Sequence, residues 1–214
     1  MHKIKLQANE ILVLHTNDKN NRAYGDFQYP EKGIVTALDW DGRAKCGGGL
    51  HGLPRGCGDG SLLNWSNDAF VLLLKVNTEK YVEFDGKCKF ESADVIFCKQ
   101  GGMTDAVAIL CAVYPDAPIV GRTATAGYKG TATAGDYGTA TAGDKGTATA
   151  GYKGIATAGN EGTATAGNEG ILIITHWDEV ANRWRKAIAS VGENGIEPNK
   201  KYRLSSDNKF VEAE

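Results

Sequence analysis

The hydrophobic pattern of the first hundred residues indicates a β-rich module. Short segments in which apolar, β-branched and aromatic residues alternate with polar ones, or run together, are typical of strands. The strands predicted in this way are Glu10–Thr16, Gly33–Asp39, Phe70–Asn77, Tyr81–Phe84 and Ala93–Cys98. The segment from Thr104 to Tyr114 instead predicts a helix that is N-capped by Thr104 and stops at Pro115. We therefore expect an α+β module over residues 1–103 and a helix with a lead-in segment over residues 104–122.

Residues 123–170 are built from six copies of one octapeptide, T-A-T-A-G-x-x-G. In the first four positions the copies differ only at Ile155, which replaces a Thr. The T-A-T-A part alternates with the period of two that a strand requires, and Thr favours strands. The G-x-x-G part supplies the permissive φ angles that a tight turn needs. A strand and a turn in every octet predict a coiling chain, a β-solenoid.

Strand geometry decides how many octets complete one coil. One octet at about 3.3 Å per residue gives a circumference of only about 26 Å, too small to enclose side chains. We therefore expect two octets per coil, with two strands on opposite sides, and three coils in the whole repeat. At about 4.8 Å per rung these coils are about 14 Å tall.

The repeat leaves open whether Ala or Thr faces the solenoid interior. Ala inside gives a thin core without buried hydroxyls, and this is the arrangement that we favour. The reverse is encouraged by Ile155 and by the run Ile171–Ile174, which place apolar side chains at both kinds of position. With Ala inside, each methyl group buries little area, so stability depends on ladder hydrogen bonds, stacking of identical rungs and caps at both ends.

The segments on either side of the repeat are predicted to supply those caps. Before it, the helix precedes Ala117–Val120, which can form a first rung. After it, two strand-like runs surround the turn at Val180–Ala181, and a second hairpin has Ser206–Asn208 at its tip. Residues 171–214 would then cover a ladder edge that is otherwise open. The predicted fold class is mainly β: a short parallel β-solenoid with two octapeptides per coil, flanked by a small α+β N-terminal module and a C-terminal β-hairpin cap.

The charge balance gives no reason to expect a nucleic acid or a membrane as partner. The chain of 214 residues has a formal net charge of −2, so no global field attracts it to polyanions. Trp177 and Trp184 with Arg183, Arg185 and Lys186 could form an aromatic and basic patch. Residues 171–214 are neutral overall, however, which favours a small hydrophobic cap. No stretch approaches the roughly 20 apolar residues of a membrane span.

The N-terminus and the cysteines bear on the compartment. The first residues lack the apolar stretch of a signal peptide, so we expect the cytoplasm of a bacterial host or a virion. The five cysteines form no C-x-x-C pair, and we interpret them as reduced, mostly buried thiols. Cys46 and Cys57 bracket His51 and are the one pair worth testing for a metal or a disulfide. We expect no metal and no cofactor.

Three motifs carry a resemblance to a known family. They are CGGGLHG at residues 46–52, GDGSLLNW at residues 58–65 and DGKCKF at residues 85–90. With them the chain resembles a family found in phages and prophages, whose members look like it along the whole length: the same front module, an Ala/Thr/Ser-rich repeat, and a module like Val191–Ile196 with a later Tyr-Arg. The resemblance implies a protein of phage or prophage type and no particular activity. The repeat alone is similar to the octapeptides of bacterial ice-nucleation proteins, but three coils are far fewer than their long arrays.

The glycine-rich stretch Asp41–Gly60 is the best candidate for a binding site. As a backbone cradle it could present His51, with Arg43, Arg55 and Asp59 within reach, to a small anionic ligand through N–H groups. Alternatively the glycines only form tight turns and His51 bonds a loop carbonyl. No G-x-G-x-x-G, G-x-S-x-G, H-E-x-x-H or P-loop pattern occurs in a suitable context, and we assign no catalytic residue.

Two further hypotheses remain open. The step His51–Gly52 resembles the start of the nucleotide pocket of ADP-ribosyltransferase-like folds, and Tyr81 and Glu83 could supply the later aromatic residue and the catalytic Glu. The Thr-x-Thr ladders, if they face outward, could bind ice or another crystal surface.

Self-association is the simpler use of a flat, uncharged ladder surface, and a dimer is expected. The predicted face comprises Thr123, Thr125, Thr131, Thr133, Thr139, Thr141, Thr147, Thr149, Thr157, Thr163 and Thr165. The sequence as a whole favours a non-enzymatic structural or binding protein. In it the solenoid serves as rigid scaffold and self-association surface, and the N-terminal module serves as recognition element for a small anionic ligand or a protein partner.

Overall fold

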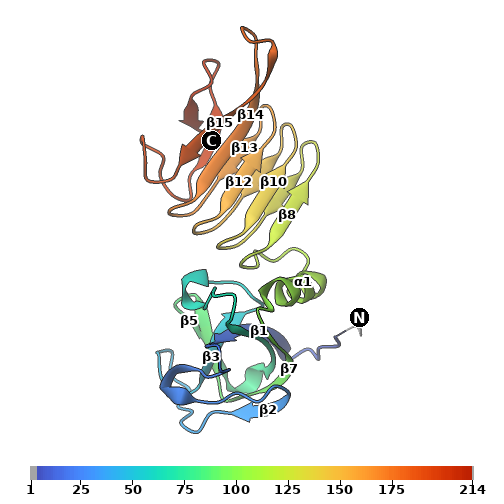
Figure 1. Ribbon diagram of the computed structural model, residues 1–214, viewed down its shortest axis with the longest axis vertical. Helices are drawn as coiled ribbons and strands as arrows, with labels where there is room; N and C mark the ends of the chain where they lie inside the picture. The colour runs from blue at the N-terminus through green and yellow to red at the C-terminus, as the bar shows by residue number, and fades with distance from the viewer. Residues whose placement is uncertain (1–3, 214) are drawn as a thin grey trace. The chain divides into compact units, whose positions relative to one another are not determined.

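A computed structural model describes residues 4–213 of the chain. The chain divides into two compact units, Met1–Ala117 and Pro118–Glu214 (Figure 1). The segment 104–122 is thereby split: helix α1 (Met103–Val113) lies in the first unit, and residues 118–122 lie in the second. None of the described helices has the length and apolar character that crossing a membrane requires.

The first unit is one antiparallel sheet with the strand order β2-β7-β4-β1-β3-β6-β5. The apolar runs of β1 and β4 pair along their whole lengths in the middle of the sheet, and Leu12, Leu14, Leu72 and Leu74 are fully buried. The strands are β1 (Glu10–Asn17), β2 (Gly33–Thr36), β3 (Leu50–Pro54), β4 (Phe70–Asn77), β5 (Tyr81–Phe84), β6 (Lys87–Phe90) and β7 (Ser92–Gln100). Short 3-10 helices cover Tyr24–Asp26, Gly60–Leu62 and Thr78–Lys80.

The glycine-rich stretch Asp41–Gly60 is not one continuous loop. Its middle forms strand β3, which pairs with β1 on one side and β6 on the other. Gly52 serves this sheet, because a Cβ atom there would lie 2.7 Å from the carbonyl oxygen of Leu14. Gly52 therefore allows β3 and β1 to approach closely. This role could not be predicted from the sequence, where Gly52 is one of many glycines.

Two predicted boundaries also need correction. Strand β2 ends at Thr36 and not at Asp39. Helix α1 begins at Met103, with Gly102 at its N-cap and no side-chain capping bond, so Thr104 is not the cap. Gly101 and Gly102 turn the chain directly from β7 into the helix, and the amide of Ala106 donates to the carbonyl of Gly102, which leaves Thr104 inside the first helical turn.

The second unit is the predicted β-solenoid (Figure 1). Its strands form two sheets, with orders β15-β14-β12-β10-β8 and β17-β16-β13-β11-β9. Thr123 pairs with Thr139 and Thr139 with Ile155, so successive coils are sixteen residues apart and each contains two octets. The strands are β8 (Thr123–Ala126), β9 (Thr131–Thr133), β10 (Thr139–Ala142), β11 (Thr147–Thr149), β12 (Ile155–Ala158), β13 (Thr163–Thr165), β14 (Ile171–Asp178), β15 (Arg183–Ser190), β16 (Lys201–Leu204) and β17 (Phe210–Glu212).

Alanine forms the interior, as favoured from the sequence. Ala140, Ala148, Ala156 and Ala164 are fully buried, whereas the Thr side chains are partly or fully exposed. Ile155 replaces an outward-facing Thr and so does not indicate a reversed core. In the next coil Leu172 and Ile174 are buried, and Ile171 and Ile173 face outward.

The turns of the repeat use their glycines differently from the prediction. The left-handed φ of each turn falls on the residue before the second glycine, for example +57° at Lys145. The glycines are required by space: a Cβ atom on Gly146 would lie 2.8 Å from the carbonyl oxygen of Gly143 and 2.9 Å from that of Gly130. Asp136 and Asp144 also connect the turns, because each carboxylate accepts the backbone N–H sixteen residues later, at 2.8 and 2.9 Å.

The C-terminal end of the coil is covered within the second unit, whereas β8 and β9 are the edge strands of the two sheets at its other end. At the C-terminal end β16 pairs antiparallel with β13, and Tyr202, Val191 and Ile196 join the buried alanine cluster. The turn between β16 and β17 lies at the predicted Ser206–Asn208. At the other end residues 118–122 form no strand, but the carbonyl of Ile119 accepts the N–H of Gly135 at 3.0 Å, which extends the coil by part of a rung.

Candidate functional site

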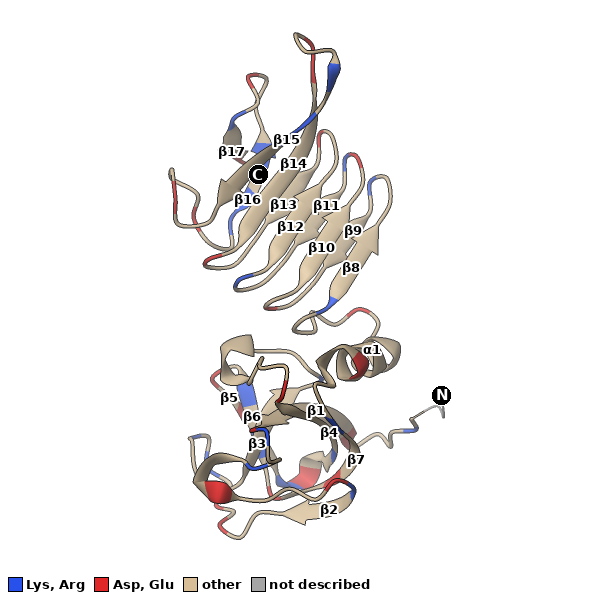
Figure 2. Cartoon of the chain, in the orientation of Figure 1, with Lys and Arg blue, Asp and Glu red and all other residues tan. Residues whose placement is uncertain are grey.

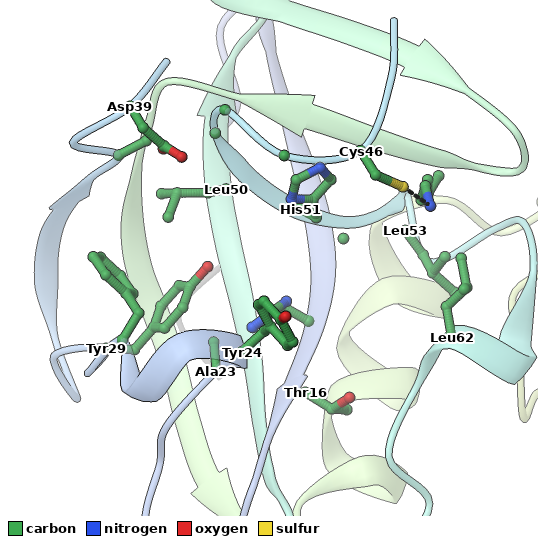
Figure 3. A pocket seen from close by; sticks show the side chains of 18 of the residues that line it. Thr16, Ala23, Tyr24, Tyr29, Asp39, Cys46, Leu50, His51, Leu53 and Leu62 are labelled. Atoms are coloured by element: carbon green, nitrogen blue, oxygen red, sulfur yellow. Dashed lines mark hydrogen bonds between the residues drawn. The ribbon is translucent and has the colours of Figure 1, made fainter. Parts of the chain in front are cut away.

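A cavity of about 760 Å³ lies in the first unit, beside strands β1 and β3 (Figure 3). Its walls come from these strands and from two loops, residues 23–29 and 37–49. Tyr24 and Leu38 are almost fully exposed at its edge. Most lining side chains are apolar: Ala23, Phe27, Ala37, Leu50, Leu53, Leu62 and Leu63. The polar groups at the walls are those of His15, Thr16, Asp39, Cys46, His51 and Lys87.

The glycine-rich loop is held against this cavity by a buried lysine. Lys89 is fully buried in β6, and its Nζ donates to Asp41 Oδ1 at 2.6 Å and to the carbonyl of Gly47 at 3.0 Å. The same ammonium lies 5.6 Å from the centroid of the Trp40 ring. The bonds from Lys89 and from Arg43 hold the pKa of the Asp41 carboxyl well below its usual range. The loop is therefore a fixed wall of the cavity.

His15 is a neutral polar group in the floor of the cavity. Burial lowers the pKa of its imidazole to about 4, so the ring is uncharged at neutral pH. Its Nε2 is 2.7 Å from Asn17 Oδ1, and the ring stacks on Tyr29 at a centroid distance of 4.7 Å. Burial also raises the pKa of the Tyr29 hydroxyl. These two rings form a polarisable but uncharged surface.

His51 lines the cavity from strand β3. Its pKa is lowered, first by burial and then by the charges of Lys87 and Lys89, while Asp39 and a hydrogen bond with the Gly49 backbone act in the opposite direction. The Nε2 atom is buried without a hydrogen-bond partner. A buried polar atom in this state costs about 1–3 kcal/mol, so a polar group that forms a hydrogen bond with it is favoured in the cavity.

A thiol and an ammonium meet at the edge of the cavity. The Nζ of Lys87 donates to the exposed Cys46 Sγ at 2.9 Å and lies 5.2 Å from the centroid of the Phe84 ring (Figure 3). Lys87 is therefore positioned to attract an acidic group that approaches the cavity, since no carboxylate within residues 4–213 forms an ion pair with it.

Of the four predicted ligand-binding residues, only His51 lines the cavity. Arg43 is paired with Asp41 at 2.5 Å, and Arg55 with Glu83 at 3.3 Å. Asp59 caps the 3-10 helix that follows it by accepting the N–H of Ser61 at 3.0 Å. Arg55 directly follows β3 and has a φ of +56°, so the chain turns there, beyond the residues that line the cavity.

The residues of the transferase-like hypothesis are not gathered around His51 either. Tyr81 donates to Glu83 on the same strand, and Glu83 also accepts from Arg55. Neither Tyr81 nor Glu83 lines the cavity.

No disulfide joins Cys46 and Cys57. Within residues 4–213 no three His, Cys, Asp or Glu side chains come together in an arrangement that could hold a metal ion.

Sequence reasoning missed His15, Asp39 and Lys87 as cavity residues and Lys89 as the anchor of the loop. His15 occupies an alternating position in a predicted strand, which gave no sign of its neighbours. Lys87 and Lys89 lie in the motif DGKCKF, where they alternate with Cys88 and Phe90, and this alternation does not indicate that Lys89 is buried.

The threonines of the predicted association face divide between the two sheets. One outer face carries Thr123, Thr125, Thr139, Thr141 and Thr157; the other carries Thr131, Thr133, Thr147, Thr149, Thr163 and Thr165. Charged side chains gather at the turns and leave the strands of the repeat uncharged (Figure 2). The two faces lie on opposite sides of the alanine core, so they cannot act as one surface.

The site was also compared with known proteins. No protein-family model, no curated protein and no solved structure matches this chain.

Proposed function

We propose that this chain is a non-enzymatic structural or binding protein of phage or prophage type. In this proposal the first unit recognises a ligand through its cavity, and the solenoid is a rigid scaffold and association surface. The observation that carries the proposal is the apolar cavity of about 760 Å³ beside His15 and His51. Cavities of about 300–1,000 Å³ with an apolar lining and a few polar groups are typical of small-molecule sites.

The lining defines the class of ligand. Leucine, alanine and aromatic side chains favour the apolar body of a drug-sized ligand. The Lys87 ammonium at the edge favours an acidic group on that body. Asp39 lies on the same lining and disfavours a ligand with several negative charges. We therefore propose a small ligand with an apolar body and one acidic group.

The polar groups of the cavity support binding more than catalysis. The His15 ring is bonded to Asn17, the His51 ring to the Gly49 backbone, and Lys87 to Cys46. A proton-transfer catalyst works best with a pKa near the working pH, whereas the pKa of His15 is lowered to about 4. Such groups orient a ligand by hydrogen bonds and charge.

Regular contacts between turns support a scaffold role for the solenoid. Lys145 and Glu161 are paired at 3.3 Å, and Lys153 and Glu169 at 3.5 Å, each pair joining turns of successive coils. The Tyr137 and Tyr152 rings meet edge to face at a centroid distance of 5.6 Å, on the same side of the solenoid as Lys153 and Glu169. With the carboxylate bonds of Asp136 and Asp144, these contacts keep the coils in one register.

The cavity can be tested with 8-anilinonaphthalene-1-sulfonate, which has an apolar body and one sulfonate. We expect saturable binding by the full chain, measured by dye fluorescence. Ala23→Phe should weaken it, because the added phenyl ring occupies part of the cavity beside the lining residues. Lys87→Met should weaken it about 10-fold, the loss of one charge-assisted hydrogen bond. The uncharged analogue N-phenyl-1-naphthylamine should bind the parent and Lys87→Met equally.

Lys153→Met is the matched control, because it removes a lysine from a turn of the second unit and should leave dye binding unchanged. Equal binding by the parent and Ala23→Phe would refute the proposed cavity site. Thermal unfolding of each variant establishes that a loss of binding is not a loss of fold.

A further inference from the structure

We propose that the chain forms a dimer through an apolar outer face on strands β12, β14 and β15 of the second unit. This isoleucine–tryptophan face consists of Ile155, Ile171, Ile173, Trp177, Trp184 and Ile188. The inference deepens the association part of the proposed function and rests on it, since it specifies where two copies meet.

Strand register places these six side chains on one surface. Ile171 lies beside Ile155 across β12 and β14, and Ile173 and Trp177 pair with Ile188 and Trp184 across β14 and β15. The alternate positions are the buried ones, because Leu172 and Ile174 point into the alanine core. In an alternating strand the residues between them must then face outward.

The exposure of these side chains is unusual for a protein surface. Ile188 is 65% exposed, Trp184 55% and Ile171 37%. The two tryptophan rings meet edge to face at a centroid distance of 5.3 Å. Tryptophan is enriched at the centres of protein interfaces, where its large area supplies much of the binding energy.

The outer face of the other sheet, which contains β9, β11, β13 and β16, has no comparable group of apolar side chains. Its rows of threonine end at β16, where Tyr202 is buried and the flanking residues Lys201 and Arg203 are exposed. Two copies that met through this end would bring like charges together. The isoleucine–tryptophan face instead continues into the uncharged rows that contain Thr141 and Thr157.

The size of the face fits a weak, reversible dimer. With about 4.8 Å between strands and about 3.4 Å per residue, the isoleucine–tryptophan face covers about 330 Å² in projection, and the threonine rows of β8 and β10 extend the outer face to about 450 Å². Accessible area exceeds projected area, and stable interfaces bury about 800 Å² per partner. A flat apolar surface is complementary to a copy of itself across a two-fold axis. Lys186 extends from the same face between Trp184 and Ile188, which favours a dissociation constant in the micromolar range over a permanent dimer.

Sedimentation equilibrium of the full chain from about 1 to 100 µM tests this dimer. We expect a reversible dimer, and Ile188→Lys should raise its dissociation constant by about 30-fold or more, since each interface then buries two new charges. Trp184→Lys should act in the same direction. Both side chains are more than half exposed, so unchanged thermal unfolding is expected for each variant.

The matched control is Thr149→Lys, which places the same charge at an outward strand position of the opposite sheet and should leave the dissociation constant unchanged. A strictly monomeric parent at 100 µM would overturn both the dimer and the association part of the proposed function. A dimer that Thr149→Lys weakens and Ile188→Lys does not would overturn the isoleucine–tryptophan face alone. Dye binding by the cavity is measured separately, so its failure leaves this result intact.

Discussion

Gly127 and Gly143 occupy the same octet position in successive coils, yet their surroundings differ. A Cβ atom on Gly143 would lie 2.8 Å from the carbonyl carbon of Gly127 and 3.0 Å from the amide nitrogen of Tyr128. A Cβ atom on Gly127 would meet nothing within 4 Å, because no earlier coil lies against it. Neither glycine has a left-handed φ. Substitution by alanine therefore measures packing between coils without a change in backbone strain.

We expect Gly143→Ala to destabilise the second unit by about 2–3 kcal/mol, the usual cost of overpacking where only backbone atoms can move aside. Gly127→Ala should be neutral or stabilising by up to about 1 kcal/mol, because alanine lowers the entropy of the unfolded chain. By this reasoning the two variants differ by at least about 2 kcal/mol, or about 30-fold in the opening equilibrium.

Hydrogen exchange measured by mass spectrometry suits this comparison, because peptides from residues 131–170 report on the second unit alone. Tryptophan fluorescence would combine the unfolding signals of both units, since Trp40 and Trp65 belong to the first unit. Exchange of the repeat peptides should be about 30-fold faster in Gly143→Ala than in Gly127→Ala. Equal exchange in the two variants would refute the argument that close approach of the coils, and not turn conformation, requires these glycines.

Further predictions concern the first unit. Because burial lowers the pKa of His15 to about 4, the unfolded chain binds the proton first, so stability should fall by up to about 3 kcal/mol as the pH drops from 6.5 to 4. Denaturant unfolding at pH 7.5 and 4.5 measures this loss, and His15→Gln should reduce it; an equal loss in that variant would contradict the assignment. Alkylation followed by mass spectrometry should label the exposed Cys46 first and Cys88, whose pKa burial raises to about 12, only on unfolding. Labelling of Cys88 in the native protein would contradict its burial. Lys89→Met should weaken the anchoring of Asp41 and lower the stability of the first unit by about 1–3 kcal/mol, seen as earlier thermal unfolding with greater exposure of Trp40. If neither the unfolding temperature nor the exposure of Trp40 changes, Lys89 does not anchor the loop.

The solenoid could be predicted from the sequence because the period of the repeat determines which residues of successive coils pair. Residues eight apart are alike, and a coil of one octet is too small to enclose side chains, so Thr123 is expected to pair with the residue sixteen positions later, Thr139. The reason for the glycines could not be predicted. The sequence shows which residue is glycine, but it does not show which backbone atoms of another coil lie against it.

The candidate site was much harder to predict, for a physical reason. The cavity depends on β3 lying between β1 and β6, and the pairing of strands distant in sequence has no local signal. His51 was found because it stands in a conspicuous glycine-rich motif. His15 and Lys87 reach the same cavity from strands whose neighbours the sequence does not specify, and Arg55 was misplaced because a positive φ turns the chain just after β3.

Departures from the repeat carry more information than the repeat itself. Ile155 replaces an outward Thr, and it lies beside Ile171 in the coil next to the β14–β15 hairpin. An isoleucine inside would have strengthened a thin alanine core, but this position faces outward and gains no core burial. Its side chain instead extends the apolar surface of Ile171 and Ile173 toward the threonine rows. The substitution therefore enlarges a surface and not a core, which is the pattern expected where a second copy of the chain covers that surface.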